Sequence, residues 1–325
     1  MMIPKTAFYE LNHAGYLQVS GEDRLAFLQR QTTNDIRLLS ASRALLSALT
    51  SPSARIIDVL YLLQDRESIG LITLPGYEEA TARFLKSRIF FMDKVSLSDA
   101  SDEFSQIDIF GTHVGSALGK LGVNSLPGVE EIWTVEISGR EIRLLHLHPA
   151  IGLDFRIIAR SPDRQDVIDL LRDSDILQAD EQEYRLFHIE AGIPYAGAEL
   201  IEAYTPLETR LESAVSQSKG CYTGQEVLAR QVNYDKITQH LSGIRLDIQM
   251  GPGRRLWAGE KLAGVITSSA QSPHYGIIAL AMLKRPHNLP GTRLEAEDET
   301  GNRSPARVVD LPFTAGEQQI AEFPD

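Results

Sequence analysis

The hydrophobic period of this chain changes near residue 240, and that change is the strongest constraint on its fold. Before residue 240, short runs with strand-like alternation are interleaved with runs of helical spacing. After it, the helical period disappears and apolar runs are separated by Gly and Pro turns. Interleaved strands and helices predict packed α and β layers, whereas short strands joined by turns predict a barrel or a sandwich. We therefore expect an α+β body followed by an all-β tail.

The expected elements of the body repeat a β-β-α-β order twice, which is compatible with two ferredoxin-like layers. Strand-like alternation predicts strands over 16–20, 54–63, 68–74, 94–99, 104–110, 132–138, 141–148 and 153–159. Helical spacing predicts helices over 22–32, 77–90, 112–121, 163–174, 180–192 and 224–232.

The length and charge of the chain limit its organisation and its partners. At 325 residues it exceeds the usual size of one hydrophobic core, so two or three domains are expected. The 44 acidic and 32 basic residues give a net charge of −12, which argues against an extended grip on nucleic acid or anionic lipid. No apolar run approaches the ~20 residues that cross a bilayer, and the N-terminus has no apolar signal segment. We expect a cytoplasmic protein that contacts neither membrane nor nucleic acid directly.

Cys221 is the only cysteine in the chain and lies in 218-SKGCYTGQEVLAR-230. A single thiol excludes internal disulfides and any metal site built from several thiolates of one chain. His146 and His148 alternate along a strand and share a face, but no third ligand is nearby, so the sequence predicts no metal site. Thr223-Gly224-Gln225-Glu226 matches the capping box, which predicts Thr223 as the N-cap of the helix that follows. Tyr222 and Val227 match the hydrophobic staple of the same helix.

Two interpretations of Cys221 stay open. The positive end of the helix and the ammonium of Lys219 would both favour a thiolate, and Gly220 and Gly224 would let a bulky group approach. Alternatively, Cys221 is a small apolar residue packed beneath the loop. Capping explains the Thr and Glu of this segment without chemistry, but it does not explain Lys219-Gly220-Cys221.

Two carboxylates stand where their surroundings are unusual. In 56-IIDVLYLL-63, alternation places Asp58 on the same strand face as Leu60 and Leu62. An acid on an apolar face has a raised pKa unless it is paired, which is common at functional sites. The alternative is a structural Asp58 paired with Arg55 or another base. Glu190 stands at an Ala-Gly helix end where a chain can pass close, and its alternative is a solvated helix residue.

Several segments of the chain resemble a known family. The segment KGCYTGQE at 219–226 is similar to the signature of the YgfZ-type folate-binding proteins, which are related to the glycine-cleavage T-protein, an aminomethyltransferase. Further segments that fit in the same order are 19–36, 54–60, 189–200, 206–236 and 267–281. The resemblance therefore extends over nearly the whole chain.

The resemblance implies three domains around a central hole that binds folate. Two would be α+β domains with ferredoxin-like elements, and the third would be a C-terminal β-barrel. The expected division assigns 1–50 with 145–240 to the first α+β domain, which carries the folate site and the cysteine motif. It assigns 51–144 to the second α+β domain and 241–325 to the barrel.

The resemblance also assigns roles to residues. The cofactor would be tetrahydrofolate or a derivative, with Asp58 near its reactive one-carbon nitrogen and Glu190 hydrogen-bonded to the pterin. A carboxylate can accept the paired N–H donors of a pterin, and an aspartate near the nitrogen could handle protons. Tyr222 and Gly224 are expected at the same cofactor site. The expected catalytic residues are Cys221, Asp58 and Lys219.

Two departures from the T-protein pattern favour the YgfZ branch. The T-protein has an asparagine where this chain offers Thr73 or Leu74, and it lacks Lys-Gly-Cys. For the YgfZ branch the resemblance implies folate-dependent support of iron–sulfur cluster assembly or repair, including cluster-containing tRNA-modifying enzymes. Cys221 would then be the functional thiol, and iron–sulfur proteins or assembly factors would be the partners. The alternatives are a T-protein-type aminomethyltransferase that uses tetrahydrofolate and a lipoyl carrier, and a folate-binding module without catalysis.

Overall fold

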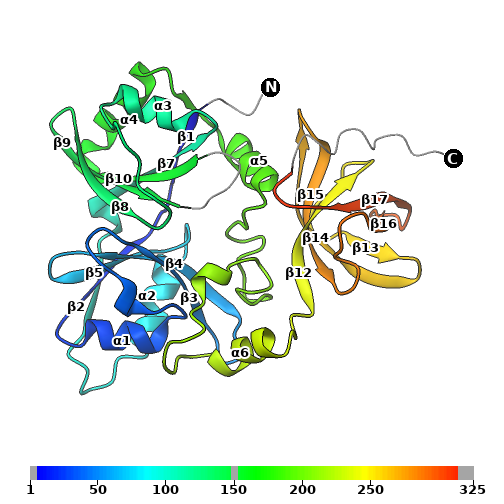
Figure 1. Cartoon of the computed structure of the whole chain (residues 1–325), viewed down its shortest axis with the longest axis horizontal. Coiled ribbons are helices and arrows are strands. Elements are labelled where there is room, and N and C mark those ends of the chain that lie inside the picture. The colour runs from blue at the N-terminus through cyan, green and yellow to red at the C-terminus, as the bar shows by residue number, and fades with distance from the viewer. Residues whose placement is uncertain (1–5, 148–152, 314–325) are drawn as a thin grey trace.

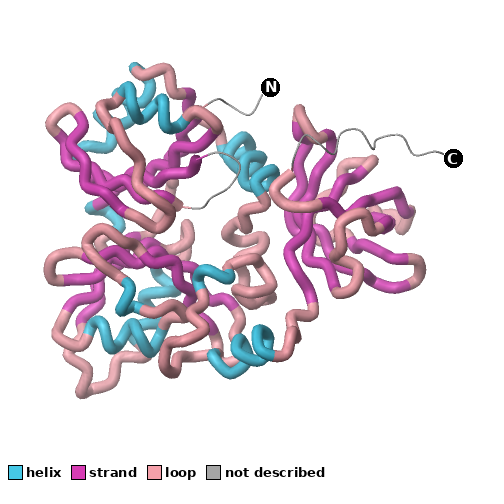
Figure 2. Tube along the Cα trace, in the orientation of Figure 1, coloured by secondary structure: helices cyan, strands magenta, loops and turns pink. Residues whose placement is uncertain are grey.

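The computed structural model describes residues 6–147 and 153–313, which form two antiparallel-rich sheets with helices and a closed barrel (Figure 1). This arrangement confirms the expected α+β body with a C-terminal β-barrel. Figure 2 shows helices confined to the body and its junction with the barrel, while the barrel is built from strands and turns. In the described part of the chain, no helix is long and apolar enough to cross a membrane.

The first sheet has five strands in the order β3-β4-β5-β2-β6, and every pairing in it is antiparallel. Two helices pack on it through a cluster that includes Phe27, Leu28 and Leu85. The strands are β2 (Tyr16–Ser20), β3 (Leu45–Thr50), β4 (Ile56–Gln64), β5 (Ser68–Ile72) and β6 (Ser96–Asp99), and the helices are α1 (Arg24–Gln31) and α2 (Glu78–Lys86).

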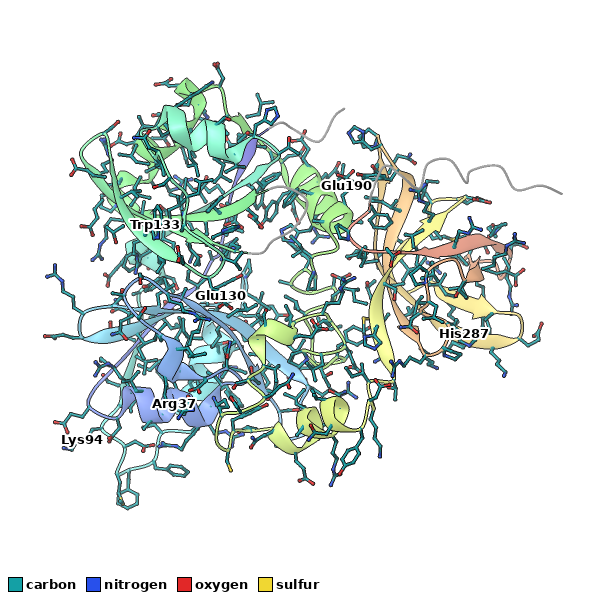
Figure 3. The ribbon with its side chains drawn as sticks, in the orientation of Figure 1. Arg37, Lys94, Glu130, Trp133, Glu190 and His287 are labelled. Carbon is teal, nitrogen blue, oxygen red and sulfur yellow. The ribbon has the colours of Figure 1, made fainter. Side chains whose placement is uncertain are left out.

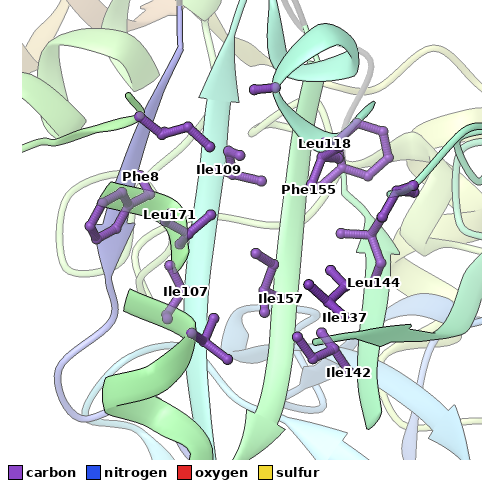
Figure 4. Close-up of a cluster of buried hydrophobic side chains, with 14 of the residues drawn as sticks. Phe8, Ile107, Ile109, Leu118, Ile137, Ile142, Leu144, Phe155, Ile157 and Leu171 are labelled. Atoms are coloured by element: carbon purple, nitrogen blue, oxygen red, sulfur yellow. The ribbon is translucent and has the colours of Figure 1, made fainter. Parts of the chain in front are cut away.

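The second sheet has six strands in the order β11-β1-β7-β10-β9-β8. Its apolar face packs Phe8, Ile109 and Phe155 against two helices, as the close-up in Figure 4 shows. The strands are β1 (Ala7–Glu10), β7 (Phe104–Gly111), β8 (Ile132–Ile137), β9 (Arg140–His146), β10 (Leu153–Arg160) and β11 (Leu177–Gln178), and the helices are α3 (Val114–Lys120) and α4 (Arg164–Asp173).

Six strands close the C-terminal barrel around Ile244, Leu256 and Ile266. Gly264 lies where two strands approach closely, because a Cβ there would stand 2.2 Å from the carbonyl oxygen of Met282. The strands are β12 (Gln239–Leu246), β13 (Arg255–Ala258), β14 (Lys261–Ser272), β15 (Gly276–Lys284), β16 (Arg293–Glu297) and β17 (Arg303–Val309).

Helix α5 (Glu181–Ala191) lies between the six-stranded sheet and the barrel (Figure 1). Asp180 and Glu183 form a capping box at its start, and Gly192 ends it in the left-handed conformation with φ +69°. Helix α6 (Gln225–Asn233) precedes the barrel. Single 3₁₀ turns complete the described part at Ile36–Leu38, Ser101–Glu103, Ser161–Asp163 and Glu212–Ala214.

The sheets group the chain differently from the expected domain division. β3 pairs with β4 across the expected boundary at residues 50 and 51, and β9 spans the one at 144 and 145. The expected unit 51–144 therefore contributes strands to both sheets, because sheet pairing joins segments that are distant in sequence. The barrel begins at β12, close to residue 241, and residues 314–325 lie outside the described part. The division into domains stays a prediction.

Replacing Phe155 by alanine should destabilise the protein by about 3–5 kcal/mol. Phe155 is fully buried in the cluster of the six-stranded sheet, so its removal leaves a cavity. Chemical denaturation of wild type and variant measures the difference. The matched control is Phe91→Ala, since Phe91 is 98% exposed and its loss should change stability by less than ~0.5 kcal/mol. Equal effects of the two substitutions would contradict the assignment of this core.

Candidate functional site

Two cavities lie beside α5. The larger, about 820 Å³, is enclosed by α5, the loop that follows it and strand β14 of the barrel. The smaller, about 90 Å³, lies between the two sheets and α5. His188 and Ile193 line both cavities. The volume of the larger cavity is in the range of small-molecule sites, so α5 forms a wall of the best candidate for ligand binding.

Glu199 connects two walls of the larger cavity. It is fully buried, and its Oε1 accepts a hydrogen bond from Ser268 Oγ at 2.6 Å while its Oε2 accepts one from Tyr195 N at 2.9 Å. The loop after α5 is thereby fixed to β14. Sequence reasoning missed this residue. The available signal was a carboxylate in a stretch from 186 to 209 that contains no lysine or arginine.

Glu190 is buried at the junction of α5 and the barrel, where Figure 3 labels it. Its Oε1 accepts a hydrogen bond from Ser272 Oγ at 2.6 Å, and Ser272 Oγ in turn accepts from the backbone N–H groups of His274 and Tyr275. Its Oε2 is buried without a hydrogen-bond partner among the described residues. Burial raises the pKa of the carboxyl, and the Ser272 hydrogen bond partly opposes that rise. The solvated alternative for Glu190 is therefore wrong, and an acceptor position remains unfilled.

Asp58 is fully buried but lines neither cavity. Its Oδ1 accepts hydrogen bonds from Val59 N at 2.8 Å and Leu74 N at 3.1 Å, and its Oδ2 accepts one from Thr81 Oγ1 of α2 at 2.5 Å. Burial is the main cause that raises its pKa to about 7. The next residue, Val59, lines the smaller cavity instead. Strand alternation thus turns the Asp58 carboxyl toward α2.

The alternative pairing of Asp58 with Arg55 is also wrong. Arg55 donates to Glu208 Oε2 at 3.2 Å and to the carbonyl oxygen of Ala203. Thr73 and Leu74, the two residues expected in place of an asparagine, both line the smaller cavity, and Leu74 also supplies a backbone donor to Asp58.

The cysteine motif begins a helix, but not by the expected capping box. α6 starts at Gln225, and its N-cap is Gly224 in the left-handed conformation with φ +83° and no side-chain cap. Glu226 pairs with Arg230, and the carbonyl oxygen of Thr223 accepts from Thr50 Oγ1 at 2.7 Å. A Cβ on Gly224 would stand 2.8 Å from Ser51 O, so this glycine lets the loop lie against the turn between β3 and β4.

Lys219 anchors the motif rather than standing free beside the thiol. Its side chain is buried, and Nζ donates to Thr32 O at 2.7 Å and to Asn34 O at 2.6 Å. The ammonium also lies 5.1 Å from the ring centre of Tyr222. Burial lowers the pKa of Lys219 to about 8.

Cys221 itself is exposed, so its buried alternative is wrong. Tyr222 is buried in a cluster with Ala54 and Leu228, and Val227 packs against the same cluster. Cys221, Lys219, Tyr222 and Gly224 line neither cavity. Glu190 lines neither cavity either. Lys219 binds the carbonyl groups of Thr32 and Asn34, whereas Glu190 binds Ser272, so the motif and Glu190 share none of these hydrogen-bond partners.

The smaller cavity holds polar residues that sequence reasoning also missed. Asp108 on β7 and Asp154 and Arg156 on β10 line it, together with Tyr184 of α5. Both aspartates are acids inside apolar strands, in QIDIF and LDFRII. They share with Asp58 the pattern of an acid among apolar strand residues. In the described ranges, no group of three or more His, Cys, Asp and Glu side chains is placed to hold a metal ion.

Comparison with known proteins identifies the family of this fold. A model of the GCVT N-terminal domain matches residues 2–219, and a model of the glycine cleavage T-protein C-terminal barrel domain matches residues 239–314. The first match alone covers more than half of the chain. The chain belongs to the glycine cleavage T-protein family.

Individual relatives agree with this T-protein assignment. An aminomethyltransferase of Bacillus velezensis is 28% identical over 332 aligned residues, which cover 95% of this chain and 87% of that protein. An Arabidopsis thaliana protein named as a chloroplastic transferase is 27% identical over 82% of this chain and 63% of its own length. The chain thus spans less than two thirds of the Arabidopsis relative. The crystal structure of the glycine cleavage system aminomethyltransferase T from Bartonella henselae has the same fold, with a TM-score of 0.83, 18% identity and coverage of 96% and 87%.

Replacing Asp58 by asparagine should remove a pH dependence of stability. The folded-state pKa of about 7 lies above the usual value for aspartate, so the stabilisation present at low pH is lost as pH rises from about 4 to about 7. The loss amounts to at most roughly 4 kcal/mol. Urea denaturation at pH 5 and pH 8 should show the wild type losing stability relative to Asp58→Asn. The exposed control Asp102→Asn should keep the wild-type profile, and an identical profile in Asp58→Asn would contradict the prediction.

Proposed function

We propose that this chain binds a tetrahydrofolate-type ligand beside α5 and acts as a one-carbon transferase of the aminomethyltransferase type. The observation that carries the proposal is the Glu190 carboxylate, which is buried at the α5–barrel junction with one oxygen lacking a partner among the described residues. The similarity to the Bacillus velezensis aminomethyltransferase supports the reaction class.

The residues present fit a pterin. A pterin presents adjacent amino and ring N–H donors, and a carboxylate can accept from both. Ser272 occupies Oε1 of Glu190 and leaves Oε2 for such donors. Glu190 and Ser272 line neither cavity themselves, but their sequence neighbours Ile189 and Gln271 line the larger one, which has room for a ligand of this size. When bound, the folate supplies the nitrogen that carries the one-carbon unit.

In this proposal, the residues of the chain bind the folate and orient it. Ser272 holds the Glu190 carboxylate in one rotamer, and its own oxygen is fixed by two backbone donors. Glu199 keeps the loop after α5 against β14, so the cavity walls are set before a ligand enters. Because burial raises the pKa of Glu190, N–H donors of a ligand would favour the ionised carboxylate.

Glu190→Gln should weaken binding of tetrahydrofolate about 10- to 100-fold. A hydrogen bond to a charged group contributes about 1.5–3 kcal/mol, and each 1.4 kcal/mol is a factor of ten. Titration calorimetry measures the affinities. The exposed control Glu202→Gln should bind like wild type. Equal affinity of Glu190→Gln and wild type would remove the support for this site.

The reaction class has its own assay. Purified protein with an aminomethyl-loaded lipoyl carrier protein and tetrahydrofolate should release ammonia, and absence of release with intact folate binding would leave a folate-binding module without this activity. Asp58→Asn tests the expected role of that carboxyl. We expect release to continue in this variant, because Asp58 faces Thr81 rather than either cavity.

A second candidate function follows from the thiol. Cys221 is exposed on a loop that buried Lys219 fixes to positions 32 and 34, so its sulfur can be reached by a partner protein. This observation favours the YgfZ-type role, in which the folate-bound protein supports assembly or repair of iron–sulfur proteins, including tRNA-modifying enzymes. The acidic surface would dock those partners rather than nucleic acid.

Under this second function, Cys221→Ser should abolish rescue of iron–sulfur enzyme activity in cells that lack the protein. Its affinity for tetrahydrofolate should equal that of wild type, because Cys221 lines neither cavity. Ser218→Ala, an exposed change in the same loop, serves as the control and should rescue fully. Full rescue by Cys221→Ser would rule out a role for the thiol.

A further inference from the structure

One carboxylate of the smaller cavity, that of Asp108, has partners within the protein for both its charge and its hydrogen bonds. Asp108 accepts two hydrogen bonds from the Arg156 guanidinium, from Nε to Oδ1 at 2.7 Å and from Nη2 to Oδ2 at 2.8 Å. Its Oδ2 also accepts a hydrogen bond from the Tyr184 hydroxyl at 2.6 Å. The third guanidinium nitrogen of Arg156, Nη1, donates a hydrogen bond to Gln106 Oε1 at 3.4 Å. The bidentate pair is therefore complete without a ligand.

The same cavity contains a second carboxylate that is not compensated. Asp154 lines it and is only 2% exposed, and its Oδ1 is buried without a hydrogen-bond partner among the described residues. The cavity lining contains two aspartates and a single guanidinium, so these three groups sum to −1 when both carboxylates are ionised. Burial and the nearby charge of Asp108 raise the pKa of Asp154, which means that a proton or another cation stabilises it.

The remaining walls restrict what that cation can be. Most of them are apolar, and the other polar residues that line the cavity are Thr73 of the loop after β5, Tyr61 of β4, and Tyr184 and His188 of α5. The apolar wall residues include Leu46, Val59, Ile72, Leu147, Leu200 and Leu211. The volume of about 90 Å³ admits only a few heavy atoms. A short alkyl group would suit the walls, and an N–H donor would suit the free oxygen.

We propose that Asp154 binds a small primary ammonium group, of the size of ammonium or methylammonium, in this cavity. The inference rests on the proposed aminomethyltransferase function, because an aminomethyl group ends in a primary amine. Asp154 supplies the counter-charge and the acceptor, while Asp108 is held out of the interaction by Arg156 and Tyr184. The role of Asp154 is to bind and position the amine.

The probe is methylammonium chloride, titrated calorimetrically into the full-length wild-type chain without folate. We expect saturable binding, with no binding of tetramethylammonium, which is larger and has no N–H donor, or of potassium at equal ionic strength. Asp154→Asn should lower the affinity at least tenfold. Asp169→Asn on the exposed face of α4 is the matched control and should bind like wild type.

The outcomes separate this inference from the proposed function. Absence of methylammonium binding to wild type would indicate that Asp154 holds a proton instead, and equal binding of potassium would indicate a cation site that does not select for N–H donors; either outcome would overturn the inference. This comparison among cations needs no variant, so it stands even if Asp154→Asn fails to fold. A protein that binds tetrahydrofolate but not methylammonium loses only this inference. One that binds methylammonium but not tetrahydrofolate keeps the ammonium site and loses the proposed function.

Discussion

Buried carboxylates accept the hydrogen bonds that join α5 to the six-stranded sheet on one side and to the barrel on the other. Asp108 of the six-stranded sheet accepts from Tyr184 of α5, and Glu190 of α5 accepts from Ser272 of the barrel. Each such hydrogen bond contributes about 1.5–3 kcal/mol, and removing one partner leaves a buried carboxylate without compensation. Both cavities use α5 as a wall, so their shapes depend on the same contacts.

The cysteine motif and the cavities are physically separate features of one chain. Lys219 and Gly224 fix the motif against the five-stranded sheet, through the carbonyl groups of Thr32 and Asn34 and the close approach to Ser51. Lys219 and Gly224 thus have structural reasons that involve no chemistry at the sulfur. The exposed thiol of Cys221 has no such reason. A surface reaction at the thiol can therefore be gained or lost without changing the fold or the cavities beside α5.

Much of the fold could be predicted because the period of the hydrophobic residues differs between helices and strands. The strand expected over 16–20 coincides with β2, and the helix expected over 180–192 contains α5. β3 was missed because all six of its residues are buried, so its sequence LLSALT lacks the alternation that marks a half-buried strand. The expected capping box at Thr223 was wrong because the backbone of Gly224 takes the N-cap position instead.

For the candidate site, the sequence by itself determined which residues share a face. It identified Asp58 as an acid among apolar neighbours and Glu190 as a helix-end carboxylate, and both are buried. Only the tertiary structure decided that Asp58 faces α2 while Glu190 meets Ser272, 82 residues away, and that Lys219 binds carbonyls more than 180 residues earlier. The physical reason is that periodicity is a local property of the backbone, whereas the partner of a buried charge is chosen by the packing of distant segments.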